Sequence, residues 1–185
     1  MVTQLQSVGM IEFTSIAAGI EAADRMMKAS LVEPLMLKTI CPGKFVVAVH
    51  GDVAAVQSAV DAGMSRADGT VADHFVIPNI NEAVVSAMAC ATPEPSGSAV
   101  GVIETFSAAS SILAADTAAK TADVDIAEVR IAMGLGGKAF CILTGDVAAV
   151  NMAVEAASNV VSQSAMLVRK VVIPSAAPEV LRNIL

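Results

Sequence analysis

The sequence predicts an α+β protein that contains two copies of one small domain. Three blocks recur in the same order in both halves of the 185-residue chain. Gly-Met-Ile-Glu at 9–12 returns as Gly-Val-Ile-Glu at 101–104, Gly-Asp-Val-Ala-Ala-Val at 51–56 returns at 145–150, and Val-Ile-Pro at 76–78 returns at 172–174. Between these blocks, short apolar runs typical of strands alternate with apolar residues at helical spacing. The chain therefore indicates a tandem duplication of a strand-and-helix domain.

The first copy is expected to contain four strands and three helices. Strands are predicted at 7–14, 33–40, 44–50 and 71–78, and helices at 16–29, 53–64 and 81–90. In the first helix, an apolar stripe of Ala17, Ile20, Ala23 and Met27 indicates one buried face. Asp52 is placed to cap the second helix, because its side chain can accept from free backbone N–H groups of the first turn.

The second copy repeats this order after a connection rich in Pro, Gly and Ser, from Cys90 to Ser98. We place one domain at 1–92, a linker at 93–98 and the second domain at 99–185. Strands are predicted at 99–106, 124–132, 138–144 and 166–174, and helices at 107–120 and from Asp146, as an N-cap, to Ser162. Gly9 matches Gly101 but Gly51 matches Gly145, so copy two gains two residues, which we place in its glycine-rich loop.

Composition excludes several classes of protein. The net charge of −7 and the 3% aromatic content argue against a nucleic-acid partner. No apolar run approaches the roughly 18 residues of a membrane span, and the first residues lack the features of a signal peptide. Three cysteines fit a reducing compartment better than a disulfide framework. Because most apolar side chains are small, each domain buries little area, and association with further copies is expected.

The repeated blocks, together with Glu-Ala-Ala-Asp-x-x-x-Lys at 21–28 and Ala-Ala-Asp with Lys120 in copy two, resemble the bacterial microcompartment shell-protein domain. The resemblance covers nearly the whole chain. It implies a small antiparallel sheet with packed helices, and a homotrimer that imitates a hexamer and tiles with other shell proteins into a microcompartment facet. It places Lys28 and Lys120 at the tile edge. The family's edge pattern also has Arg after Val-Ile-Pro, where this chain has Asn79 and Ser175.

The resemblance also implies a function for the loop between the second and third strands, which surrounds the central pore in this family. In copy one the loop comprises Thr39, Ile40, Cys41, Pro42 and Gly43, and it looks like that of tandem shell proteins of the propanediol-utilization type. In those proteins one cysteine from each chain binds a [4Fe-4S] cluster on the threefold axis. Carried over by position, the ligand is Cys41. The resemblance implies that the cluster transfers electrons across the shell, and an encapsulated redox enzyme is a further candidate partner. Zinc held by three thiolates and water is the alternative metal.

Copy two has no cysteine in the matching loop, which contains Gly134, Leu135, Gly136 and Gly137. Lys138 after these glycines suggests a phosphate loop, but a Walker loop needs a helix next, and an apolar strand is predicted instead. We interpret the glycines as allowing close backbone approach around an axis.

Other reactive residues are interpreted as structural. Cys90 and Cys141 have no ligand partners at metal-binding spacing, and His50 and His74 have no histidine counterparts in copy two. Glu12 and Glu104 end matching strands and are expected to be hydrogen-bonding groups. No catalytic constellation is visible, so we expect a shell protein and not an enzyme. The alternative functions are a non-redox pore that passes or binds a small metabolite, and a nucleotide-binding sensor or small enzyme that uses the glycine loop.

Overall fold

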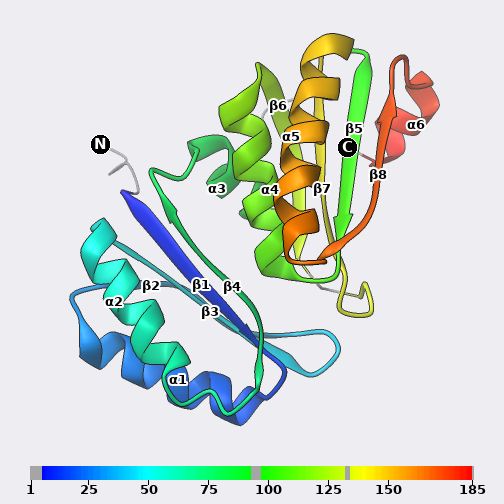
Figure 1. Cartoon of the computed structure of the whole chain (residues 1–185). Coiled ribbons are helices and arrows are strands. Elements are labelled where there is room, and N and C mark those ends of the chain that lie inside the picture. The colour runs from blue at the N-terminus through cyan, green and yellow to red at the C-terminus, as the bar shows by residue number, and fades with distance from the viewer. Residues whose placement is uncertain (1–5, 93–96, 132–133, 185) are drawn as a thin grey trace. The chain divides into compact units, whose positions relative to one another are not determined.

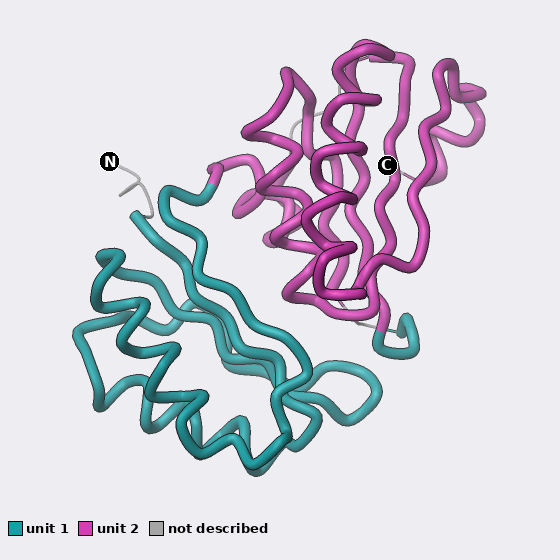
Figure 2. The backbone as a smooth tube through the Cα atoms, viewed as in Figure 1, with its two compact units in different colours: residues 1–80, 132–137 teal, residues 81–131, 138–185 magenta. Residues whose placement is uncertain are grey.

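The computed structural model describes residues 6–92, 97–131 and 134–184. The chain divides into two compact units, one of residues 1–80 with 132–137 and the other of residues 81–131 with 138–185 (Figure 2). Most of the predicted linker, residues 93–96, and residues 132 and 133 at the predicted loop of copy two lie outside the described residues.

The first unit is a four-stranded antiparallel sheet with two helices on one face (Figure 1). Its elements are β1 (Ser7–Phe13), α1 (Ile16–Ala29), β2 (Glu33–Ile40), β3 (Lys44–Gly51), α2 (Val53–Met64) and β4 (Val71–Pro78). The strand order is β2-β3-β1-β4. Ile11, Phe13 and Val47 from the sheet and Met26 and Val60 from the helices form part of its core. The predicted antiparallel sheet with packed helices is confirmed.

The second unit repeats this arrangement, with the strand order β6-β7-β5-β8. Its elements are α3 (Glu82–Met88), β5 (Ala99–Thr105), α4 (Ala108–Thr121), β6 (Val124–Ile131), β7 (Ala139–Gly145), α5 (Val147–Gln163), β8 (Leu167–Ile173) and α6 (Pro178–Ile184). The helix α3 comes from the first sequence repeat but packs against β6 and α4 of this unit. The helix α6 was not predicted by the sequence reasoning, which ended its last element at residue 174.

The repeated glycine of the first block has a packing role. A Cβ atom on Gly9 would lie 2.6 Å from Val60 Cγ2 of α2, and one on Gly101 would lie 2.6 Å from Val154 Cγ2 of α5. Such distances are far below van der Waals contact, so in each unit a residue without a side chain allows the central strand and a helix to approach closely. The repeat at these positions is therefore a requirement of the fold.

Both predicted N-cap positions are confirmed, but only one of the two aspartates makes a capping hydrogen bond with its side chain. Asp52 accepts a hydrogen bond from Ala55 N at 2.9 Å, as predicted. Asp146 occupies the matching N-cap position with similar backbone angles, but its side chain makes no capping hydrogen bond. The predicted N-cap position of Asp146 is therefore confirmed, but the side-chain hydrogen bond of Asp52 is not repeated, because matching backbone geometry does not fix the side-chain rotamer.

The strand registers locate the two extra residues of copy two. Lys38 of β2 pairs with Val46, and Arg130 of β6 pairs with Phe140, so the hairpin is two residues longer in the second unit. The extra residues thus lie in the β6–β7 connection, as predicted.

None of the helices among the described residues is both long enough and apolar enough to span a bilayer.

Candidate functional site

The turn between β2 and β3 presents a cysteine at its first position. Cys41, Pro42 and Gly43 form the turn, whereas Thr39 and Ile40 belong to the end of β2. The cysteine is partly exposed, and Pro42 and Gly43 are exposed. Gly43 has φ of +76°, a conformation that favours glycine. The sequence thus folds locally into a short turn that brings a thiol to the surface.

The matching connection in copy two is longer and rich in glycine. Gly134, Gly136 and Gly137 all have positive φ, and Leu135 between them is partly buried. Gly137 lies within the same compact unit as the cysteine turn, and a Cβ atom on it would lie 2.8 Å from Pro42 Cδ. The connection leads into the strand β7 and not into a helix. A Walker loop requires a helix at this point, so the connection is not of that type. Where the connection meets the cysteine turn, a residue without a side chain is needed.

A lysine follows each of these connections and pairs with a glutamate of the central strand. Lys44 Nζ lies 2.7 Å from Glu12 Oε1, and Lys138 pairs with Glu104 in the same way. Glu12 lies opposite Val46 in the sheet, two residues along β3 from Lys44, so the two charged side chains share one face of the sheet. The sequence reasoning missed these pairs, although the repetition of both residues in both copies was a usable signal.

The three thiols differ strongly in environment. Cys141 is fully buried in β7, and burial raises the pKa of its thiol to about 12, so the thiolate needed for metal binding is disfavoured. Cys90 is exposed and follows α3. Within the described residues of one chain, no group of three or more His, Cys, Asp or Glu side chains could hold a metal ion.

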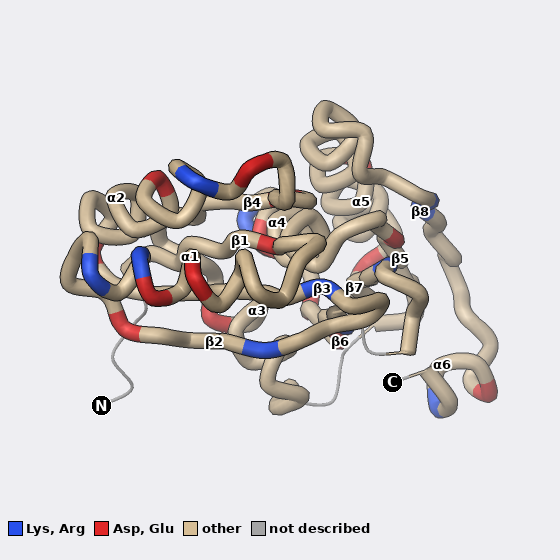
Figure 3. Tube along the Cα trace, turned by 90° about the horizontal axis from the view of Figure 1, so that it is seen from below, with Lys and Arg blue, Asp and Glu red and all other residues tan. Residues whose placement is uncertain are grey.

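Each of the two predicted edge lysines forms an ion pair with an aspartate one turn earlier in the same helix. Lys28 Nζ lies 2.7 Å from Asp24 Oδ2 on α1, and Lys120 Nζ lies 2.6 Å from Asp116 Oδ2 on α4. Figure 3 shows acidic and basic residues interspersed along α1. Both lysines are exposed and stand near the end of their helices, where a cation is favoured by the helix dipole.

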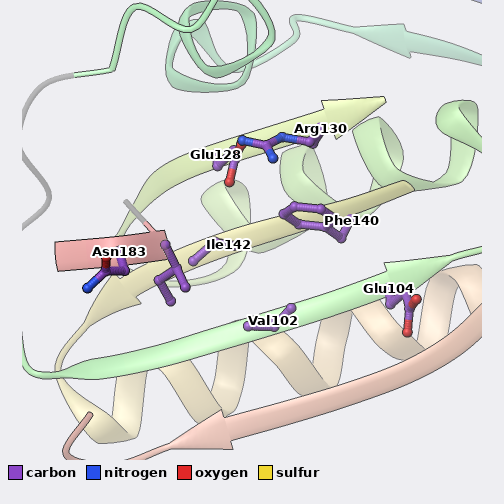
Figure 4. A pocket seen from close by; sticks show the side chains of 8 residues that line it. Val102, Glu104, Glu128, Arg130, Phe140, Ile142 and Asn183 are labelled. Atoms are coloured by element: carbon purple, nitrogen blue, oxygen red, sulfur yellow. The ribbon is translucent and has the colours of Figure 1, made fainter. Parts of the chain in front are cut away.

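The second unit also contains an open cavity of about 420 Å³ on the sheet face away from α4 and α5 (Figure 4). Val102, Phe140 and Ile142 form its apolar part, and Glu104, Glu128, Arg130, Asn183 and Ile184 complete the lining. Arg130 pairs with Glu128 and lies over the Phe140 ring, 5.6 Å from its centroid, and Glu104 pairs with Lys138. Each charged group of the lining thus has an ion-pair partner.

Comparison with known proteins assigns the family. The BMC domain model matches residues 7–80 and again residues 99–176. The chain belongs to the BMC-domain family, and its two domains make it a tandem-domain shell protein of a bacterial microcompartment. It is similar to the bacterial microcompartment shell protein PduT of Citrobacter freundii, with 44% identity over 91% of this chain and 92% of the relative.

Two solved structures have the same fold. A microcompartment protein from Desulfitobacterium hafniense DCB is 53% identical, with a TM-score of 0.82 over 95% of this chain and 98% of that one. A fused, permuted hexameric shell protein from the RMM microcompartment has a TM-score of 0.64 at 23% identity, over 84% of this chain and 81% of that one. The second likeness concerns the fold alone.

Proposed function

We propose that three copies of this shell protein form a trimer that imitates a hexamer, and that their three Cys41 thiolates hold a [4Fe-4S] cluster on the threefold axis. The observation that carries the proposal is the difference between the two matching turns. The β2–β3 turn of each chain carries one accessible thiol, at Cys41, and the corresponding turn of copy two contributes glycines instead. A trimer of such chains has three thiols at equivalent positions, whereas six identical turns would have six.

The residues of the cysteine turn fit this group. Fe–S clusters take thiolate ligands, and Cys41 is accessible, unlike the buried Cys141. Pro42 has no backbone N–H, so Gly43 is the nearest following residue whose N–H could donate to a cluster sulfide. When bound, the cluster would supply one-electron transfer, with one iron not held by cysteine. The trimer would thereby conduct electrons across the shell, and its role is structural and redox rather than enzymatic.

The ion pair beside the turn supports the same role. Lys44 begins β3 directly after Gly43, and its bond to Glu12 joins the end of the turn to the central strand. This bond restrains the backbone that carries Cys41.

Anaerobic purification and reconstitution test the proposal. We expect about four irons and four sulfides per three chains, a brown chromophore and, after reduction, an electron paramagnetic resonance signal. Cys41→Ala should lose all of these. Cys90→Ala is the matched control, because it removes the other exposed thiol, and it should keep them.

Two results would contradict the cluster. The wild-type protein could bind no iron after anaerobic reconstitution, or Cys41→Ala could retain the iron and its spectrum. Zinc in place of iron at one ion per trimer would support Cys41 as a ligand but refute the redox role. Absence of all metal would favour the alternative of a non-redox pore for a small metabolite.

A further inference from the structure

A small polar pocket lies in the second unit, at the end of the sheet where β6 begins and β7 ends. It has a volume of about 200 Å³ and is lined by Gly97, Asp123, Val124, Asp125, Gly145 and Asp146. The β6–β7 connection lies at the opposite end of the same two strands. Three of the lining residues are aspartates, and none of the six is basic. The pocket therefore gathers negative charge at a place that the proposed function does not use.

The pleat of the sheet places a buried hydroxyl beside these carboxylates. Asp125 of β6 lies directly opposite Thr144 of β7 in the antiparallel register. Side chains of directly opposite residues lie next to each other on one face of a sheet. Every second residue of an extended chain returns to that face, and Asp146 keeps an extended backbone, with φ of −72° and ψ of 145°. The hydroxyl of Thr144 thus lies on the side of the sheet to which Asp125 and Asp146 belong.

Thr144 supplies an observation that is independent of the acidic residues. Its residue is 1% exposed, and its Oγ1 has no hydrogen-bond partner within the part of the chain that the structure describes. A buried hydroxyl without a partner costs free energy. Its oxygen can accept a hydrogen bond from a donor that lies against Asp125. What this end of the sheet lacks is therefore a donor, and a positively charged one would also offset the carboxylates.

The matching place in copy one contains a nitrogen of the protein itself. The strand registers place Glu33 opposite His50, as they place Asp125 opposite Thr144. His50 Nε2 lies 3.7 Å from Glu33 Oε2. Copy two replaces this imidazole with a hydroxyl that cannot carry a positive charge. The nitrogen that copy one supplies internally would have to come from a ligand in copy two.

The side chain of Asp146 is available to such a ligand. Its counterpart Asp52 has similar backbone angles and uses its carboxylate to cap α2, whereas Asp146 makes no side-chain capping bond to α5. Copy two also has Asp123 where copy one has Leu31, which is 93% exposed. Compared with copy one, the pocket has gained one carboxylate and released another from the helix terminus.

We propose that this pocket binds a small primary amine in its ammonium form, with a short aliphatic diamine as the best match. An ammonium group has three N–H donors and no acceptor, which suits carboxylates and a hydroxyl without a partner. A coordinated metal ion fits less well, because the described residues include no group of three or more His, Cys, Asp or Glu side chains that could hold one. Hydrogen bonds span longer distances than metal–oxygen bonds, so more widely spaced carboxylates can still bind an ammonium group.

Calorimetric titration of the full-length chain with 1,4-diaminobutane at low salt tests the site. We expect saturable binding of one molecule per chain. Asp123→Asn and Asp146→Asn should each weaken binding by about tenfold, because each removes a charged acceptor. Thr144→Val changes no charge and should weaken binding by about fivefold, through loss of the hydroxyl. Circular dichroism verifies that each variant is folded.

Asp52→Asn is the matched control, because it removes the same charge at the matching position of copy one, and it should leave the affinity unchanged. 1-Butanol, which has no ammonium group, should not bind. Absence of saturable diamine binding to the wild type would overturn the proposal. So would equal weakening by Asp123→Asn and Asp52→Asn, since that would indicate attraction to the net negative charge alone. None of these results depends on iron binding at Cys41.

Discussion

At the scale of single residues, the two lysine–glutamate pairs place the same chemistry in different environments. Glu12 is fully buried and Lys44 largely so, whereas Glu104 and Lys138 are partly exposed. Removing one partner of a buried pair leaves the other charge without compensation, which is costly. An exposed pair contributes little, because water and salt screen it. The pair beside Cys41 should therefore matter more to stability than its counterpart.

We predict that Lys44→Met lowers the free energy of unfolding by about 3 kcal/mol, and that Lys138→Met lowers it by less than about 1 kcal/mol. Urea unfolding followed by circular dichroism checks both values. In the double variant Glu12→Gln with Lys44→Met, much of the loss should be recovered, because no ionised carboxylate remains buried. Equal losses in the two single variants would refute the claim that the buried pair contributes more to stability than the exposed one.

Sequence reasoning reached part of this site. Cys41 was predicted as a ligand because a resemblance implied a role for its turn and because copy two lacks a matching cysteine, and this role stays a prediction. The Glu12–Lys44 pair could not be identified from spacing alone. The two residues are 32 positions apart, and only the antiparallel register of β1 and β3 brings them onto one face of the sheet.

At the scale of helices and strands, the two N-cap aspartates offer a matched comparison. Asp52 accepts from Ala55 N, whereas Asp146 makes no capping bond. We predict that Asp52→Ala lowers the free energy of unfolding by about 1 kcal/mol and Asp146→Ala by only a few tenths. Thermal unfolding of both variants under one condition checks this. A larger loss for Asp146→Ala would show that the bond forms in solution.

The strands and longer helices were predictable because strand and helix periodicities repeat in both copies. The predicted buried face of α1 was largely wrong, because Ile20 of the predicted stripe is exposed whereas Met26 is buried. The helix α6 was missed although its counterpart α3 was predicted. Its seven residues are fewer than an isolated helix needs, so its stability depends on packing that the local sequence does not reveal. The repeat could have revealed it, because Val180 and Leu181 stand where Val84 and Val85 stand in copy one.

At the scale of the whole molecule, association should contribute to stability. If three copies associate as in the proposed function, folding and assembly are linked, and dilution favours unfolding. We predict that the melting temperature of the wild type rises with protein concentration. Differential scanning calorimetry over a 100-fold concentration range checks this. A concentration-independent wild type would contradict the linkage.

The position of α3 has a consequence for protein engineering. The first sequence repeat continues through α3, but the N-terminal segment of the first compact unit ends at Ile80, so the sequence repeat and the compact unit have different boundaries. A chimera that exchanges the first repeat at residue 92 would import a foreign α3 onto the native α4 and β6. An exchange directly after Ile80 keeps that contact native. The splice after Ile80 is therefore the one that leaves the packing of the second unit unchanged.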